Sequence, residues 1–262
     1  MIGIILAAGH SKRMGELTKA FPKCMLPIQG RPLLHHTIDR LKEVGCDEIV
    51  IIVGYKSENI TATDCTLIEN INYSSNNVLH SLMFAREYLS EDVICCYSDI
   101  WLEPEVLIDL NKIGGDIVIS VDDDWKNYYL GRTEHPINEA ENVLYDSSLR
   151  IHRIGKDIIP INSSELTCGE FRGLWKMNSN GSKKFVNVFD DLDLELDMDT
   201  PFQNALEWQK SYITDILQEM TDLHQIINLS ITKRKWAELD TQQDYNRLLK
   251  IAECQGLVAL MS

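Results

Sequence analysis

Short apolar runs rich in isoleucine and valine alternate with amphipathic segments over roughly the first 120 residues. A short apolar run bounded by turn residues is typical of a strand that is buried on both faces of a sheet. Strands that alternate with helices predict an α/β fold with a doubly wound, mostly parallel, Rossmann-like sheet. We expect strands at 1–8, 48–54, 65–71, 92–99 and 116–122, and helices at 32–45, 76–89 and 104–113.

The second half of the chain is less regular. Residues 143–156 and 170–177 predict antiparallel strands, which suggests a smaller antiparallel region beside the parallel sheet. Further elements are expected as helices at 182–192, 201–220 and 241–253 and as a strand at 224–231. No internal repeat, low-complexity linker or evident break interrupts the chain, so we expect the 262 residues to form a single domain.

The overall composition excludes several classes of partner. The formal net charge is −15 and the sequence pI is about 4.8, which argues against nucleic acid and anionic membrane surfaces. No apolar stretch approaches the roughly 20 residues of a membrane span, and the apolar run at 4–8 is too short for a signal peptide. Seven scattered cysteines without a CxxC pair predict reduced thiols in a cytoplasmic protein rather than a zinc site.

Cationic residues gather after the first predicted strand although the chain is acidic. Lys12, Arg13, Lys19 and Lys23 follow it, with only Glu16 against them. A glycine-containing turn between a strand and a helix offers backbone N–H groups to phosphate oxygens. In doubly wound sheets, ligands bind beyond the carboxyl ends of the strands, where this turn would lie.

Two common phosphate-binding motifs are absent from this turn. Met14 stands where the P-loop pattern would place its second glycine after Gly9, and Gly9-His10-Ser11 does not fit the dinucleotide fingerprint. The remaining pattern is ILAAGxxxRM, then LT and PK, and then GxPLL at 30–34. This combination resembles the opening of the sugar-phosphate nucleotidyltransferase superfamily.

The resemblance implies roles for the residues of the turn. Arg13, with Lys12, would bind the β- and γ-phosphates of a nucleotide, and Lys23 would reach the reacting phosphates. Ser11 replaces a second glycine and Glu16 replaces a proline of the sugar-specific enzymes, which disfavours the sugar branch. The alternative is a surface loop with solvated lysines. The nucleotide-binding residues expected here are Leu6, Ala7, Ala8, Gly9, Ser11 and Lys12.

The resemblance also implies a Mg²⁺ site made by two aspartates, one after a central strand and one in a late Asp-Thr motif. Asp99 and Asp240 fit these places, and Glu238 is a third candidate ligand. Mg²⁺ takes one or two carboxylates together with phosphate oxygens. An Asp at a strand end is otherwise often a turn residue. The chain shows no Ser-His-Asp arrangement, but a phosphate nucleophile needs no strong base because its second pKa is about 6.

The segment YSSNNVLHSL resembles the base-reading segment of the phosphocholine and phosphonate cytidylyltransferase branch. Tyr73, Asn76, Asn77 and Ser81 would then contact a pyrimidine, although an Asn here could also cap the following helix. The segments EFRGLWKM and WAELDT resemble the same branch. The implied division of the domain is a nucleotide-binding core at 1–122, an acceptor-binding elaboration at 123–235, and a metal-binding motif with a C-terminal helix at 236–262.

Acceptors in this branch join a phosphoryl group to an amine: phosphoglutamine, phosphocholine and aminoalkylphosphonates, of which we expect the first. Aromatic faces and carboxylates can bind an ammonium group. The acidic run at 190–199 could contribute, but an exposed strand edge or solvated face is the simpler interpretation. The predicted acceptor-binding residues are Lys156, Glu170, Arg172, Trp125, Tyr129 and Trp175.

These observations predict a Mg²⁺-dependent cytidylyltransferase that uses CTP and a small phosphorylated amine or amino acid and releases pyrophosphate. The resemblance implies a role in modifying cell-surface or capsule polysaccharide, and a homodimer is compatible with it. One alternative is a sugar-1-phosphate uridylyl- or thymidylyltransferase. Another is a catalytically silent nucleotide-binding regulator, which would have no chemical need for Lys23, Asp99 and Asp240 together.

Overall fold

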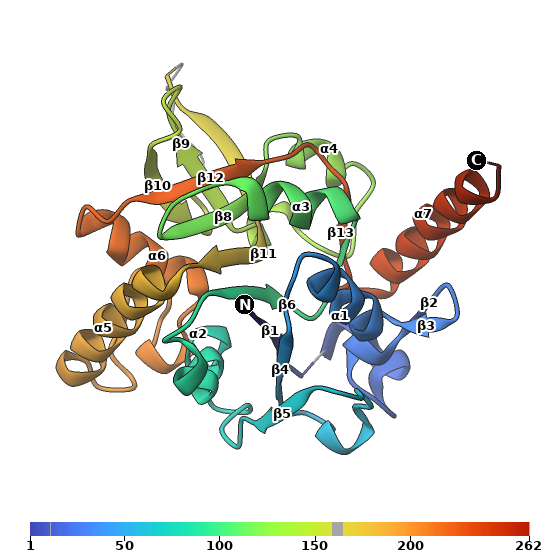
Figure 1. The fold of residues 1–262 in the computed structure, drawn as a ribbon, viewed down its shortest axis with the longest axis horizontal. Helices are drawn as coiled ribbons and strands as arrows, with labels where there is room; N and C mark the ends of the chain where they lie inside the picture. Colours follow the sequence, from blue (N-terminus) through green and yellow to red (C-terminus); the bar gives the residue numbers. More distant parts are fainter. Residues whose placement is uncertain (11, 159–164, 262) are drawn as a thin grey trace.

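A large sheet forms the centre of the protein. The structure, a computed structural model, describes residues 1–10, 12–158 and 165–261, without the side chains of Lys12 and of residues 253–261. β1 (Ile2–Ala7) pairs in parallel with β4 (Glu48–Val53) and β6 (Val93–Tyr97), and β5 (Thr66–Glu69) follows β4 (Figure 1). The mostly parallel α/β fold predicted from the apolar runs is confirmed.

Helices cover both faces of this sheet because successive residues of a strand point to opposite sides. Ile5 and Ala7 of β1 belong to one hydrophobic core, and Ile4 and Leu6 belong to the other. The first core is covered by α1 (Leu33–Glu43) and α3 (Pro104–Lys112), and the second by α2 (Val78–Leu82), α5 (Ser179–Glu195) and α6 (Ile213–Asp222).

The parallel order ends at β6, where a long antiparallel strand enters the sheet. β11 (Thr167–Met177) lies between β6 and β8 (Ile117–Asp122) and is antiparallel to both. The strand expected at 116–122 therefore forms but does not pair with its predecessor in the chain. The remaining strands of the sheet are β9 (Asn142–Tyr145) beside β11, β10 (Ile151–Gly155) beside β9, and β12 (Ile227–Ile231) in parallel with β8.

Gly173 allows β11 to change its register. The pairing of β11 with β8 shifts between Phe171 and Trp175, and Gly173 lies within this shift with a φ of 67°. A Cβ atom at Gly173 would collide with the ring of Tyr97. Only glycine therefore fits at the point where β11 crosses the end of β6.

The other elements are short, apart from the last helix. Two small antiparallel ribbons pair β2 (Pro27–Ile28) with β3 (Arg31–Pro32), and β7 (Ile100–Leu102) with β13 (Trp236–Glu238). The long helix α7 (Gln242–Met261) ends the chain and projects from the body of the molecule (Figure 1). The short helical elements are η1 (Lys12–Thr18), η2 (Lys23–Met25), η3 (Ser57–Asn59), η4 (Met83–Tyr88), α4 (Trp125–Tyr128), η5 (Ile137–Glu139) and η6 (Trp208–Lys210).

One of the local predictions is wrong, and another holds in one of its two alternatives. The helix expected at 201–220 begins only at Ile213, because the preceding residues turn back so that Trp208 is fully buried. Its indole nitrogen donates to Asp193 at 3.0 Å. The acidic run at 190–199 is a solvated face rather than a strand edge: its first part completes α5, with Leu194 86% exposed, and the rest forms a turn.

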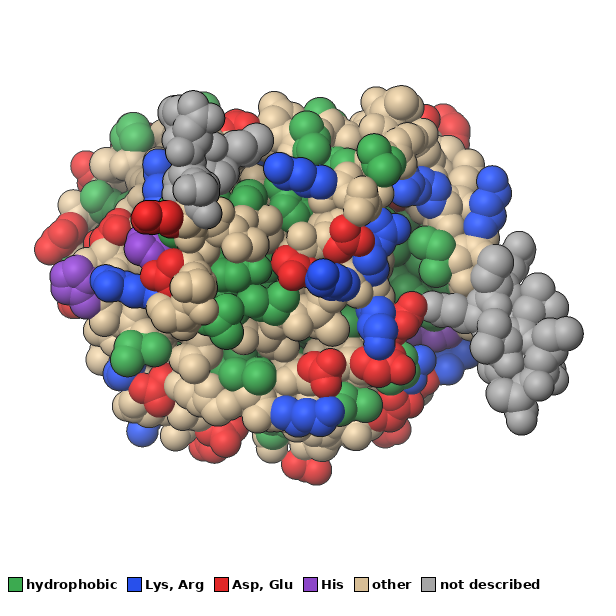
Figure 2. Space-filling view, turned by 90° about the horizontal axis from the view of Figure 1, so that it is seen from above, with side chains coloured by type: hydrophobic (Ala, Val, Ile, Leu, Met, Phe, Trp, Pro, Cys, Tyr) green, Lys and Arg blue, Asp and Glu red, His purple; other side chains and the backbone are tan. Residues whose placement is uncertain are grey.

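The described surface carries both signs of charge. On the face drawn in Figure 2, acidic and basic side chains are interspersed. Within the described part of the chain, the helices are too short or too polar to cross a membrane.

Gly54, directly after β4, provides a test of the packing at this end of the sheet. A Cβ there would lie 2.7 Å from the Cβ of Tyr73 and 2.9 Å from the carbonyl oxygen of Ala8, which accepts a hydrogen bond from the Tyr55 amide. We expect Gly54→Ala to lower the free energy of unfolding by about 1–3 kcal/mol through overpacking. Gly114→Ala, whose Cβ meets no atom within 4 Å, is expected to change it by less than about 0.5 kcal/mol. Urea denaturation measures both, and equal midpoints for the two variants would contradict this account.

Candidate active site

A cavity of about 780 Å³ opens beyond the carboxyl ends of β1, β4 and β6. This is the position at which doubly wound sheets bind ligands. Segments from both halves of the chain line it. The predicted site residues among the described lining are Leu6, Ala7, Ala8, Gly9, Arg13, Lys23, Tyr73, Asn76, Asn77, Ser81, Asp99, Tyr129, Lys156, Glu170, Arg172, Glu238 and Asp240.

Lys23 lies between two carboxylates at the floor of the cavity. Its Nζ contacts Asp99 Oδ2 and lies 2.6 Å from Asp240 Oδ1. Burial opposes the charge of Lys23, but the two aspartates outweigh it, so the pKa of Lys23 is raised. Burial likewise opposes the charge of Asp240, and Lys23 outweighs it, so the pKa of Asp240 is held low. The group is a half-buried cluster in which one ammonium lies between two carboxyl groups.

The small ribbon of β7 and β13 brings the two aspartates together. Asp99 follows β6, and Asp240 follows β13 from the far end of the chain. The Leu239 amide donates to the Asp99 carbonyl at 2.8 Å, which extends the pairing of the two strands as far as the site. The expectation that the two aspartates share a site came from the family resemblance, because neither local sequence by itself predicts the pairing of β7 with β13.

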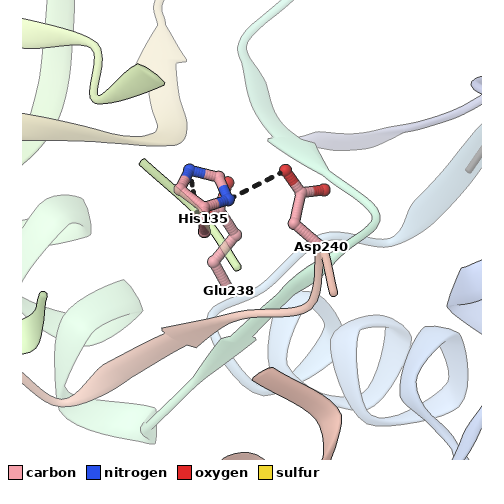
Figure 3. Close-up of side chains that lie close together, drawn as sticks. All are labelled: His135, Glu238 and Asp240. Atoms are coloured by element: carbon pink, nitrogen blue, oxygen red, sulfur yellow. Dashed lines mark ion pairs between the residues drawn. The ribbon is translucent and has the colours of Figure 1, made fainter. Parts of the chain in front are cut away.

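A histidine that the sequence reasoning missed joins Glu238 and Asp240. His135 Nδ1 lies 3.4 Å from Asp240 Oδ2, and His135 Nε2 lies 3.7 Å from Glu238 Oε2 (Figure 3). Burial and the nearby Arg132 lower the pKa of His135 to about 4, so its imidazole is neutral at pH 7. Burial and the neighbouring Asp240 raise the pKa of Glu238.

Arg132 holds this part of the site in position. Its side chain is fully buried, and it donates to Glu238 Oε2 at 3.0 Å and to Asp244 Oδ1 at 2.8 Å. The guanidinium also lies 4.7 and 4.8 Å from the ring centres of Tyr128 and Tyr129. Asp244 in turn accepts from the backbone amide of Thr241, which agrees with the predicted helix start there. Arg132 thus connects Glu238 to the beginning of α7.

Asn70, a second residue that the sequence reasoning missed, organises the wall formed by Asn76 and Ser81. It is fully buried, and its amide nitrogen donates to Asn76 Oδ1 at 3.0 Å and to Ser81 Oγ at 2.7 Å. Asn77 occupies the N-cap position of α2, but its side chain donates to the Lys210 carbonyl at 2.9 Å instead of capping the helix. Fixed amides and hydroxyls on a cavity wall can read the polar edge of a base.

Lys156 and three neighbours line another part of the cavity. Lys156 Nζ lies 2.9 Å from Glu139 Oε2 and 4.4 Å from the ring centre of Tyr212. Arg13 Nη2 approaches the same Glu139 oxygen at 3.9 Å. Glu141 accepts from Thr214 Oγ1 at 2.7 Å, and burial raises the pKa of its carboxyl group. No local signal predicts a site role for Glu139, Glu141 or Tyr212, because each lies in an irregular segment or at a helix start.

Glu170 and Arg172 both belong to β11, but their surroundings differ. Glu170 accepts from the Tyr129 hydroxyl at 2.7 Å, and burial raises the pKa of Glu170 to about 8. Arg172 is fully buried and donates to Ser120 Oγ at 2.9 Å and to the Thr232 carbonyl. Its terminal nitrogens are therefore engaged within the protein, so a role for Arg172 on an acceptor phosphate has no support from its contacts.

Two predicted acceptor residues lie elsewhere. Trp125 and Trp175 are 1% and 0% exposed, belong to the hydrophobic cores and are absent from the described cavity lining. Their prediction as acceptor-binding residues is thereby corrected: burial of their large apolar area outweighs any use of their ring faces. The Lys12 side chain and Ser11 lie outside the described residues.

The donor set fits a divalent cation. Asp99, Glu238 and Asp240 supply carboxylate oxygens, which are the ligands that Mg²⁺ prefers. Asp99 Oδ1 is buried and finds no hydrogen-bond partner among the described residues. His135, Glu238 and Asp240 each offer one ligand atom within 4.8 Å of the others.

Similarity to known proteins extends over nearly the whole chain. The family model described as the MobA-like NTP transferase domain matches residues 3–152. A CTP:phosphoglutamine cytidylyltransferase of Campylobacter jejuni is 24% identical over 93% of this chain and 97% of that protein. A choline-phosphate cytidylyltransferase of Haemophilus influenzae is 23% identical over 95% of this chain and 97% of that protein. The solved structure of a CTP:phosphocholine cytidylyltransferase of Streptococcus pneumoniae shares the fold, with a TM-score of 0.67 and 20% identity over 95% of this chain and 98% of that one.

Arg132 provides a test of the site's framework. We expect Arg132→Met to lower the free energy of unfolding by about 3–5 kcal/mol, because it leaves the buried Asp244 without its ion-pair partner. Arg247→Met is the matched control: Arg247 also lies over Tyr128, but among the described residues it donates only to the backbone carbonyls of Leu130 and Tyr128, so about 1 kcal/mol or less is expected. Urea denaturation compares the two, and a loss no larger in Arg132→Met than in the control would contradict the role assigned to Arg132.

Proposed function

Since the chain belongs to the MobA-like NTP transferase domain family, we propose that it is a Mg²⁺-dependent cytidylyltransferase. It would transfer CMP from CTP to a small phosphorylated acceptor and release pyrophosphate. The observation that carries the proposal is the position of Lys23. Its charged ammonium lies between Asp99 and Asp240, in the cavity that the loop after β1 also lines. Nucleotidyl transfer brings two anions together and needs a cation at this point.

The proposed reaction uses the chain's own cations for charge stabilisation. An oxygen of the acceptor's phosphoryl group attacks the α-phosphorus in line, and the bond from that phosphorus to the oxygen bridging to the β-phosphorus breaks. The electron pair leaves with pyrophosphate. Lys23 stabilises the charge that develops at the α-phosphate, and Arg13, whose side chain is 48% exposed at the cavity, holds the departing phosphates.

Asp99, Glu238 and Asp240 would hold the Mg²⁺ ion. When bound, the ion supplies positive charge against the phosphate oxygens of both substrates. The unpartnered Asp99 Oδ1 supports this assignment, because a buried carboxylate oxygen without a donor favours a cation.

The nucleotide base would be read by Tyr73, Asn76, Asn77 and Ser81. An amide side chain offers both a donor and an acceptor, as the polar edge of cytosine requires. The hydrogen bonds from Asn70 support this role because they fix Asn76 and Ser81 before a ligand binds. The backbone of Leu6, Ala7, Ala8 and Gly9 would hold the phosphates, together with Lys12 and Ser11.

The acceptor would be a phosphorylated amino acid of the phosphoglutamine type, ahead of phosphocholine and aminoalkylphosphonates. Such an acceptor carries an amine and a carboxylate, and the cavity offers both signs of charge in Lys156 and Glu139, together with the carboxyl groups of Glu141 and Glu170. Tyr129 would contribute a ring. This division assigns the nucleotide to residues 1–122, the acceptor to 123–235, and metal binding, with the last helix, to 236–262.

The cellular setting follows from the same proposal. A CDP-linked product is suited to donate its phosphoryl group to a cell-surface or capsule polysaccharide. The six cysteines whose side chains are described are free thiols, as expected for a reaction in the cytoplasm, where CTP is made. A homodimer stays a prediction.

A substrate panel tests the proposed function. Pyrophosphate release is measured with CTP, UTP and dTTP, each with phosphoglutamine, phosphocholine, 2-aminoethylphosphonate and glucose 1-phosphate. We expect release with CTP and an amine-bearing acceptor, with phosphoglutamine preferred. Release with UTP or dTTP and glucose 1-phosphate alone would point to a sugar nucleotidyltransferase. Binding without release in every combination would point to a silent regulator.

Lys23→Ala tests the catalytic assignment. Removal of a preorganised cation costs about 10²–10³-fold or more in kcat, so we expect at least this loss in steady-state pyrophosphate release. Lys19→Ala is the matched control, since Lys19 pairs with Glu16 on the surface and its side chain is 69% exposed. A circular-dichroism melt verifies that each variant is folded. Turnover near the wild-type rate in folded Lys23→Ala would refute the assignment.

A further inference from the structure

His135 is buried with one ring nitrogen unused. The residue is 3% exposed, and its Nδ1 has no hydrogen-bond partner within the described part of the chain. A buried polar atom without a partner lowers the free energy of unfolding by about 1–3 kcal/mol. Such atoms are therefore rare in native proteins and call for a functional explanation.

The unused nitrogen faces one carboxylate, that of Asp240, and the other ring nitrogen faces the carboxylate of Glu238. His135 Nδ1 lies 3.4 Å from Asp240 Oδ2, without the geometry of a hydrogen bond, and ligand atoms of His135, Glu238 and Asp240 lie within 4.8 Å of one another. Figure 3 shows one dashed line from the ring to Asp240 and a second from its other nitrogen to Glu238. Two oxygens and one nitrogen that share a small volume form a typical set of metal ligands.

Asp240 presents a different oxygen to each of its neighbours. Its Oδ1 accepts from Lys23, whereas its Oδ2 faces His135. A cation between His135 and Glu238 could therefore contact Asp240 Oδ2 while Lys23 keeps its own contact.

We propose that His135 is a ligand of the divalent cation, together with Glu238 and Asp240. The presence of a cation in the reaction rests on the proposed function, but the binding of an ion by these residues can be tested without it. Imidazole is a ligand that suits ions such as Co²⁺ and Zn²⁺ better than Mg²⁺. His135 would thus make the site more selective for such ions than carboxylates alone would.

The test uses the full-length protein, stripped of metal, with Mn²⁺ alone as the probe. Electron spin echo modulation detects ¹⁴N bonded to Mn²⁺, and we expect this signal in the wild type and its loss in His135→Asn. His152→Asn is the matched control: His152 lies on β10, contacts Asp146 at 2.8 Å and is absent from the described cavity lining. We therefore expect the ¹⁴N signal to persist in His152→Asn.

Calorimetry with Co²⁺ gives a second measurement. We expect His135→Asn to weaken Co²⁺ binding by about 10-fold or more and to weaken Mg²⁺ binding less. The size follows because the loss of even a residue that only supports a metal ligand lowers metal affinity by about 10-fold. A wild-type protein without ¹⁴N modulation overturns the proposal without recourse to any variant. So does a signal that His135→Asn retains.

The outcome is distinct from that of the substrate panel. Pyrophosphate release with CTP but no ¹⁴N signal would reject the histidine ligand and leave the cytidylyltransferase standing. A ¹⁴N signal that depends on His135, without turnover of any nucleotide, would establish the cation site and reject the proposed reaction.

Discussion

The ion cluster of Lys23, Asp99 and Asp240 is the interaction on which the rest of the site depends. Buried charges are costly unless they are paired, so each of the three groups requires the others in place. They come from η2, from the end of β6 and from the segment after β13. The pairing of β7 with β13 and the bond from the Leu239 amide to Asp99 make this meeting possible. The fold therefore has to be complete before the cluster can form.

The same cluster explains why an acidic chain gathers cations after its first strand. Among the described lining residues, six carboxylates stand against four cationic side chains: Asp99, Glu139, Glu141, Glu170, Glu238 and Asp240 against Arg13, Lys23, Lys156 and Arg172. Lys23, Arg13 and Lys156 each contact at least one of these carboxylates. A polyphosphate that enters the cavity would exchange these carboxylate partners for its own oxygens. In the free site these three cations are paired, and the excess of carboxyl groups would favour a cation that accompanies the ligand.

The elements that the sequence predicts correctly are those whose signals lie within their own segment. Strands such as 48–54 and the helix at 104–113 follow from periodicity and from Pro104 at a helix start, because these signals lie within the segment itself. The insertion of β11 could not be predicted, since its partners lie far from it in the chain and only Gly173 marks the crossing. Ring chemistry suggests Trp125 and Trp175 as acceptor-binding residues, but both rings are buried in the hydrophobic cores. His135 and Asn70 gave no signal: a single polar residue in an irregular segment shows its purpose only through tertiary contacts.

Asp240 joins the two halves of the proposed chemistry. One of its oxygens neutralises Lys23 and the other faces His135, so the charge of this carboxylate is shared between a lysine and a candidate cation site. In the proposed reaction Lys23 turns toward a phosphate, and Asp240 then loses part of its neutralising charge. The affinity of the cation site must rise as a result, and by thermodynamic linkage a bound cation must favour the turn of Lys23 toward the nucleotide by the same factor. In the proposed reaction, the geometry of this single carboxylate would therefore couple nucleotide binding to metal binding without any movement of the fold.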